Sequence, residues 1–170
     1  GRTIGKLGAT AVLMGGPDIL TSLASGAIDA AEWICPIADL GLGMHQAAKF
    51  YYGPGWHEPS TLLDLSIDLK EWEGLDADTQ ALMMEMAKAF NVDVFSRFQA
   101  LNGPALGKLL NEHGVQLKTF PDELLIALGN AAGEVMEERG SINSQTKAIC
   151  NHLLSFRKNI MDWSTKGESE

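Results

Sequence analysis

The chain of 170 residues is 45% apolar and 21% charged, a composition typical of one globular domain or two small lobes. It has 13 Lys plus Arg against 22 Asp plus Glu, a formal net charge of -9, and this balance disfavours partners bound through phosphates or an anionic bilayer. No stretch approaches the roughly 18 consecutive apolar residues of a membrane-spanning helix. We therefore expect no nucleic-acid partner and no membrane insertion.

The first 48 residues alternate between short apolar runs and helical patterns. The runs at 9–14 and 27–33 predict buried strands. Helices are predicted from Pro17 to Gly26, with proline in the first turn and glycine as the cap, and over 36–48. Strands and helices that alternate with short links are typical of a parallel α/β layer.

The middle of the chain changes from extended to helical patterns. Aromatic and turn residues crowd 50–59, and apolar residues alternate with polar ones over 63–67, which predicts an extended segment, a loop and a strand with one buried face. From Asp68 onward, apolar residues spaced at threes and fours predict long helices. Asn102-Gly103-Pro104 predicts a kink or a break.

The last third predicts a short strand and two helices. The strand falls at 115–120, and proline followed by two acidic residues begins a helix that runs from Pro121 to Gly140. The final helix spans about 141–163 and carries an apolar repeat every seven residues, which predicts packing on one partner helix. That partner is either a second copy or the 121–139 helix of the same chain. We call the repeat the heptad seam; it consists of Ile142, Ile149, Phe156 and Trp163, with Thr146, Leu153 and Ile160 between them.

Sequence signatures of common enzyme classes are absent. The chain has no P-loop, no GxGxxG after a strand, no GxSxG and no HExxH. Cys35 and Cys150 lack metal-ligand spacing. A catalytic pair with Cys35 as the nucleophile and His57 as the base is supported by residue type alone. The favoured interpretation is that Cys35 is a buried, unreactive cysteine.

An acidic motif ends the second predicted strand. Residues 29–33 read Asp-Ala-Ala-Glu-Trp, and an unpaired buried carboxylate at that place is costly. Ligands of α/β layers bind at the carboxyl ends of strands, so Glu32 and Trp33 are candidate ligand-binding residues. A carboxylate that caps the next helix or faces solvent is the alternative.

A second candidate segment is the loop at 51–58. Glycine and proline restrict the backbone of this loop. Trp56 and its aromatic neighbours supply apolar side chains suited to the walls of a small-molecule pocket, and Glu58 supplies a carboxylate. A turn anchored by core aromatics is the alternative. Glu32 and Glu58 in one cleft repel each other unless a cation lies between them. An oxygen-lined site of that kind favours Na⁺ or Ca²⁺ over zinc.

Three motifs in this order resemble the solute-binding proteins of tripartite ATP-independent periplasmic (TRAP) transporters, and most of all their 2-oxo-acid-binding branch. They are LASGAIDAAEW at 23–33, YYGPGWHE at 51–58 and IDLKEWEGL at 67–75. The resemblance spans nearly the whole chain and matches about the C-terminal half of the family's length. It implies a partial periplasmic-binding-protein (Venus-flytrap) fold of the α/β class, helix-rich overall, in which long helices follow a short parallel or mixed sheet.

The resemblance also implies a periplasmic receptor that catalyses nothing. Such a receptor binds a small 2-oxo or 2-hydroxy carboxylate through a bridging Na⁺ or Ca²⁺ and passes it to membrane permease subunits. The family pattern puts a side-chain oxygen of Glu32 and the backbone carbonyl of Trp33 on the cation, and Trp33, Trp56 and Glu58 in the substrate pocket. Arg2 lies within a predicted helix, so it does not take the role of the family's substrate-carboxylate arginine, which precedes that helix.

The expected organisation has three regions. Residues 1–60 form an α/β lobe segment with the ligand motifs, 61–140 supply a strand and long helices that join and cover the lobes, and 141–170 form a C-terminal helix and a polar tail. The resemblance favours a homodimer through that helix. It also leads us to expect no measurable substrate binding by these 170 residues alone, because a two-lobed receptor closes both walls on its ligand.

Two other classes of function compete with the receptor interpretation. A helical interaction or scaffold module without a small-molecule ligand is the alternative, because the heptad seam by itself predicts a partner helix. An enzyme that uses Glu32 and Glu58 as acid and base has the least support.

Overall fold

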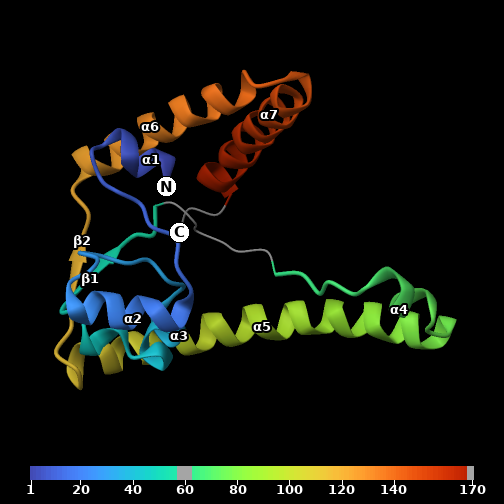
Figure 1. Cartoon of the computed structure of the whole chain (residues 1–170), viewed down its shortest axis with the longest axis horizontal. Helices are drawn as coiled ribbons and strands as arrows, with labels where there is room; N and C mark the ends of the chain where they lie inside the picture. Colours follow the sequence, from blue (N-terminus) through green and yellow to red (C-terminus); the bar gives the residue numbers. More distant parts are fainter. Residues whose placement is uncertain (57–62, 168–170) are drawn as a thin grey trace. The chain divides into compact units, whose positions relative to one another are not determined.

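The structure is a computed structural model that describes residues 1–56 and 63–167. The chain divides into two compact units (Figure 1). Unit 1 comprises Gly1–Leu13 and Phe120–Glu170, and unit 2 comprises Met14–Thr119. Helices dominate both units, and the expected helix-rich α/β class is confirmed.

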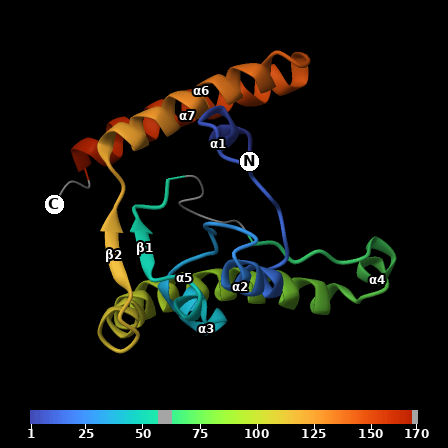
Figure 2. The ribbon, with the colours of Figure 1, turned by 60° about the vertical axis from the view of Figure 1, so that its left-hand side comes forward.

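Unit 2 holds a short parallel sheet and the helices around it. The two strands lie side by side (Figure 2) and pair in parallel, from Phe50 opposite Gln116 to Gly53 opposite Thr119. The predicted extended segment at 50 and the predicted strand at 115–120 are thus confirmed. In chain order the elements are α2 (Gly16–Ser25), α3 (Pro36–Leu42), the 3-10 turn η1 (Met44–Gln46), β1 (Phe50–Gly53), α4 (Leu69–Glu73), α5 (Ala77–Asn111) and β2 (Gln116–Thr119).

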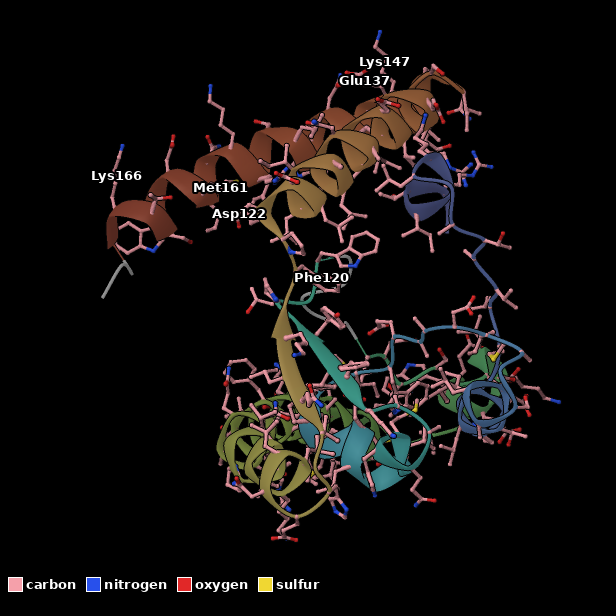
Figure 3. The ribbon with its side chains drawn as sticks, turned by 90° about the vertical axis from the view of Figure 1, so that its left-hand side faces the viewer. Phe120, Asp122, Glu137, Lys147, Met161 and Lys166 are labelled. Atoms are coloured by element: carbon pink, nitrogen blue, oxygen red, sulfur yellow. The ribbon has the colours of Figure 1, made fainter. Side chains whose placement is uncertain are left out.

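Unit 1 is a helical hairpin with a short helix packed on it. Its elements are α1 (Arg2–Lys6), α6 (Asp122–Gly140) and α7 (Ser144–Gly167). The α6 helix begins after Pro121 and ends at Gly140, as predicted. Lys6 ties α1 to α6, since its Nζ lies 2.9 Å from Glu134 Oε2 and 2.6 Å from Glu138 Oε1. Figure 3 shows Glu137 and Lys147 at the end of the hairpin where α6 turns into α7.

The heptad seam of α7 remains largely exposed. Although α7 packs against α6, the contact lies close to the turn, where a Cβ on Gly140 would stand 3.6 Å from that of Cys150. Ile142, Ile149, Phe156 and Trp163 are each at least 57% exposed. The alternative in which the seam packs on the 121–139 helix of its own chain is therefore wrong.

Three predicted strands, at 9–14, 27–33 and 63–67, are irregular segments in the structure. A strand needs a neighbour that accepts and donates its backbone hydrogen bonds. Among the described residues, β1 and β2 are the only strands that pair. Leu13 is fully exposed and Leu63 is 75% exposed, so an apolar run alone does not bring burial.

The helix boundaries follow glycine conformation more than proline position. Gly26 adopts a left-handed φ of 74° and ends α2 as predicted. Gly43, with φ 79°, ends α3 before the predicted limit of 48 and leads into η1. Of the kink or break predicted at 102–104, the break is wrong, because α5 stays helical across Pro104.

The core of unit 2 lies where α3 packs on α5 and the chain enters β2. Leu109 and Ala105 on α5 are buried there, as is Val115 just before β2. Asn102 of α5 accepts the backbone N–H of Ile37 at 3.2 Å, which caps the otherwise unpaired start of α3. Within the residues described, no helix combines the length and apolar content needed to cross a bilayer.

Candidate functional site

The Glu32–Trp33 motif lies in the irregular segment between α2 and α3 of unit 2. Glu32 is exposed and Trp33 is half-buried. The indole rests on the first residue of α2, because a Cβ at Gly16 would stand 2.5 Å from its Cη2 atom. The absence of a side chain on Gly16 thus makes room for the Trp33 ring.

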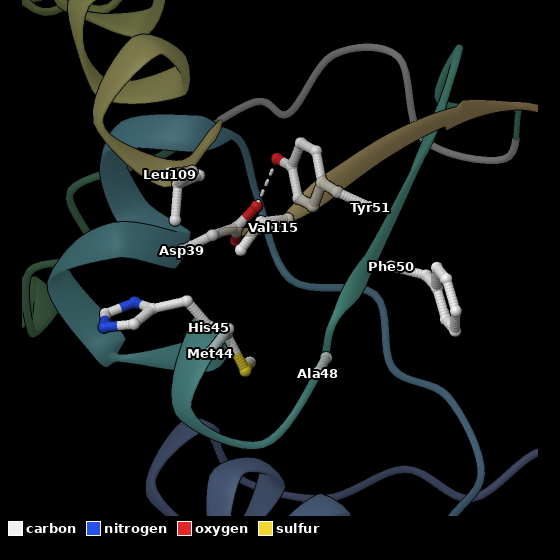
Figure 4. A pocket seen from close by; sticks show the side chains of 8 residues that line it. All are labelled: Asp39, Met44, His45, Ala48, Phe50, Tyr51, Leu109 and Val115. Carbon is white, nitrogen blue, oxygen red and sulfur yellow. Dashed lines mark hydrogen bonds between the residues drawn. The ribbon is translucent and has the colours of Figure 1, made fainter. Parts of the chain in front are cut away.

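A buried carboxylate, that of Asp39 in α3, lies behind this motif. It is 7% exposed. Its Oδ2 accepts the hydroxyl of Tyr51 at 2.5 Å (Figure 4), and its Oδ1 accepts the backbone N–H of Ile34 at 3.4 Å. Burial raises the pKa of Asp39, and the hydrogen bonds from Tyr51 and from the N–H groups of Ile34 and Cys35 lower it in part.

Tyr51 connects the same carboxylate to β1. Burial raises the pKa of its hydroxyl strongly, and the hydrogen bond to Asp39 raises it further, so Tyr51 stays protonated and donates. Asp39 therefore joins the segment after Trp33 to the strand that leads into the 51–58 loop. The sequence did not point to Asp39, because an acidic residue in the first turn of a helix is ordinary.

A cavity of about 20 Å³ adjoins Asp39 (Figure 4). That volume has room for about one water molecule and is too small for a three-carbon acid. The cavity is thus a packing feature beside the site rather than the ligand pocket. It is lined by Asp39, Met44, His45, Ala48, Phe50, Tyr51, Leu109 and Val115.

Two histidines stack at the edge of this cavity. The ring centroids of His45 and His113 lie 3.9 Å apart, with an interplanar angle of 30°. The Nδ1 atom of His45 is buried and has no hydrogen-bond partner within the described part of the chain. Burial lowers the pKa of His45, and the charge of His113 lowers it further.

We expect the folding stability of the chain to fall below neutral pH because of His45. Its folded pKa lies below the ordinary 6.5, so the unfolded chain binds more protons as the pH drops through about 6.5. As the pH is lowered from about 7.5 to 5, the free energy of unfolding should therefore fall more in wild type than in His45→Gln. Denaturant unfolding of both proteins measures this. Asp39, in the same cavity, is present in both proteins, so its contribution cancels in the difference between their free energies of unfolding. If that difference does not change with pH, the prediction is contradicted.

The sequence-predicted site residues are only partly brought together. Glu32 and Trp33 are adjacent, Trp56 is half-buried in the same unit, and Glu58 lies outside the described residues. The described residues contain no group of three or more His, Cys, Asp or Glu side chains that could hold a metal. Glu32 and the Trp33 carbonyl thus offer two oxygen donors, and a hard cation takes more. Cys35 and Cys150 are both free thiols.

The helix-rich α/β architecture and the acid-tryptophan motif fit one class of protein, the periplasmic-binding-protein type of solute receptor. Residues 1–141 match the family of bacterial extracellular solute-binding proteins, family 7. The match covers most of the chain, and the chain belongs to this family. The solved TRAP solute-binding proteins described below confirm the expected TRAP resemblance and the partial binding-protein fold.

The similar proteins include three from different bacteria. A monocarboxylate 2-oxoacid-binding periplasmic protein of Nostoc sp. is 34% identical over 168 residues, which are 99% of this chain and 46% of the Nostoc protein. A TRAP solute-binding protein of Pseudoalteromonas atlantica, solved with bound sodium and pyruvate, has a TM-score of 0.90 and 29% identity over 99% of this chain and 51% of its own.

A TRAP solute-binding protein of Bordetella bronchiseptica has a TM-score of 0.87 and 30% identity, over 98% of this chain and 49% of its own. Its structure is a dimer with calcium and picolinate in one site and an apo second site. The chain thus spans about half the length of the relatives it matches.

Proposed function

We propose that this chain supplies part of the binding site of a TRAP solute receptor in the periplasm. The receptor binds a small 2-oxo or 2-hydroxy carboxylate through a bridging Na⁺ or Ca²⁺, releases it to membrane permease subunits and catalyses no reaction. The observation that carries the proposal is the exposed Glu32 carboxylate next to a half-buried Trp33, in a family whose Pseudoalteromonas member holds sodium with pyruvate.

The site residues take separate roles in this proposal. A side-chain oxygen of Glu32 and the backbone carbonyl of Trp33 bind the cation, since hard cations prefer oxygen donors. Trp33, Trp56 and Glu58 line the pocket around the carbon chain of the ligand. The cation offsets the repulsion between the ligand carboxylate and the acidic side chains.

Calorimetry tests the receptor proposal directly. The full-length receptor that carries this sequence is titrated with pyruvate in the presence of Ca²⁺ or Na⁺ and again after removal of the cation with chelator and a Na⁺-free buffer. We expect binding only with a cation, and unchanged pyruvate after incubation. Absence of binding under every condition would favour the scaffold alternative, and consumption of pyruvate would favour an enzyme.

We also propose that the receptor forms a homodimer through α7. The heptad seam leaves several large apolar side chains exposed on one helix, and exposed apolar patches of this kind mark association sites. A two-fold axis brings the same stripe of two copies together. The Bordetella relative was solved as a dimer, which supports a dimeric receptor.

Truncation after Gly140 is expected to convert the dimer to a monomer, because it removes the whole seam. Light scattering of the intact and truncated proteins measures the mass. Phe156→Ser should weaken the dimer in the intact chain, whereas Ser155→Ala, one position away from the seam, should not. Equal monomeric masses with and without α7 would contradict the dimer.

A further inference from the structure

The peptide unit between Trp33 and Ile34 joins the proposed cation ligand to a buried acceptor. Its N–H, from Ile34, points at Asp39 Oδ1 over 3.4 Å, and its C=O belongs to Trp33. A peptide unit is planar, and in the trans form its N–H and C=O point in opposite directions. Among the described residues, only the peptide bond between Gly53 and Pro54 is cis. The Trp33–Ile34 peptide is therefore trans. Whatever holds the Ile34 N–H therefore also sets the direction of the Trp33 carbonyl.

We propose that Asp39 is a positioning residue that aims the Trp33 carbonyl at the bridging cation. This inference rests on the proposed function, in which that carbonyl is a cation ligand. Asp39 touches neither cation nor substrate in this proposal, and acts only through the peptide unit in front of it.

The surroundings of Asp39 hold its carboxylate in one orientation. It is buried in the first turn of α3, and its other oxygen is held by the Tyr51 hydroxyl of β1. The start of α3 is in turn fixed to α5 through the bond between the Ile37 N–H and Asn102 Oδ1. Two separate elements thus stop the carboxylate from rotating away from Ile34.

The Trp33 side chain is restrained on its own side of the peptide. Its indole lies against the backbone of Gly16 at the start of α2, where a Cβ would clash. The ring and the following N–H are therefore both held, one by α2 and the other by Asp39. The carbonyl between them has little freedom to turn, which is the preorganisation that a cation site needs.

Charge adds to this geometry. An anionic acceptor behind an N–H polarises the peptide, and the carbonyl oxygen at its other end becomes more negative. A more negative oxygen is a better ligand for Na⁺ or Ca²⁺. Groups that orient metal ligands typically change metal affinity by about ten- to a hundredfold when they are removed.

The test measures the cation requirement of pyruvate binding in the full-length receptor. For wild type, Asp39→Ala and Asp39→Asn, pyruvate binding is titrated against Ca²⁺ to find the half-saturating concentration. We expect this concentration to rise about ten- to a hundredfold in Asp39→Ala, and less in Asp39→Asn, which keeps an acceptor oxygen but loses the charge. At saturating Ca²⁺, both variants should recover most of their affinity for pyruvate.

Leu109→Ala is the matched control, because it loosens the same core without touching the Trp33–Ile34 peptide. It should lower the melting temperature and leave the half-saturating Ca²⁺ concentration within about twofold of wild type. If Asp39→Ala does not fold, Asp39→Asn decides. The proposal is overturned if folded Asp39 variants need no more Ca²⁺ than wild type, or if Leu109→Ala shifts the requirement equally. Wild type that binds pyruvate without any cation would instead overturn the cation site itself, and this inference with it.

Discussion

Glu32→Gln in the full-length receptor is expected to weaken pyruvate binding about ten- to a hundredfold. Glutamine keeps the size of the side chain and one acceptor oxygen, but it loses the charge that attracts the cation. A charge-assisted contact is worth roughly 1.5–3 kcal/mol, which corresponds to that change in the dissociation constant. Because Glu32 is exposed, the free energy of unfolding should change by about 1 kcal/mol or less, well below the change in the free energy of binding. Calorimetry at fixed Ca²⁺ and denaturant unfolding measure the two quantities.

Glu73→Gln is the matched control for this experiment. Glu73 is an exposed acid at the end of α4 in the same unit, so its replacement removes the same charge without altering the proposed site. Its dissociation constant should stay close to that of wild type. An unchanged dissociation constant in Glu32→Gln would contradict the assignment of Glu32, and equal losses in both variants would indicate a long-range effect of net charge.

The helices could be predicted from the sequence because their ends are coded locally. Proline in the first turn of α2 and a left-handed Gly26 after it fix that helix within a few residues. Pro121 and Gly140 do the same for α6. Such signals act through the φ angle and the hydrogen bonds of neighbouring residues, so they need no knowledge of the rest of the fold.

The strand regions at 50 and 115–120 were predicted, but which extended runs pair could not be predicted in the same way, because pairing depends on distant residues. β1 and β2 are 66 positions apart in their register, as Phe50 pairs with Gln116, and β2 consists of exposed residues. The apolar run at 9–14 has a sequence pattern more typical of a buried strand than that of β1 or β2. It has no strand beside it among the described residues, and hydrophobicity does not supply a hydrogen-bonding partner.

The candidate site shows the same division between local and distant information. The acid-tryptophan motif and the loop with Trp56 were visible as unusual residue types in sequence. Asp39 was not, because its importance comes from burial and from Tyr51, twelve residues away. The role that we assign to Trp33 involves its backbone carbonyl, and a backbone atom leaves no signature in the side-chain sequence.

Leu109→Ala is expected to lower the free energy of unfolding of unit 2 by about 2–5 kcal/mol. Leu109 is only 2% exposed, and it lies on α5 beside the Asp39 cavity. Its backbone carbonyl also accepts the N–H of Val115 at 3.0 Å, so the chain cannot easily close over the lost side chain. The methyl groups removed leave a void, and the loss of contacts around it adds to the lost transfer free energy.

The stability of unit 2 can be followed separately by tryptophan fluorescence. When the 170 residues alone carry Trp163→Phe, the three tryptophans that they retain, Trp33, Trp56 and Trp72, all lie in unit 2. Urea unfolding of this protein with and without Leu109→Ala then gives the change in free energy. Leu82→Ala is the control on the same helix, because Leu82 is 62% exposed and should cost less than about 0.5 kcal/mol. A loss of similar size in both variants would mean that burial on α5 does not hold unit 2 together.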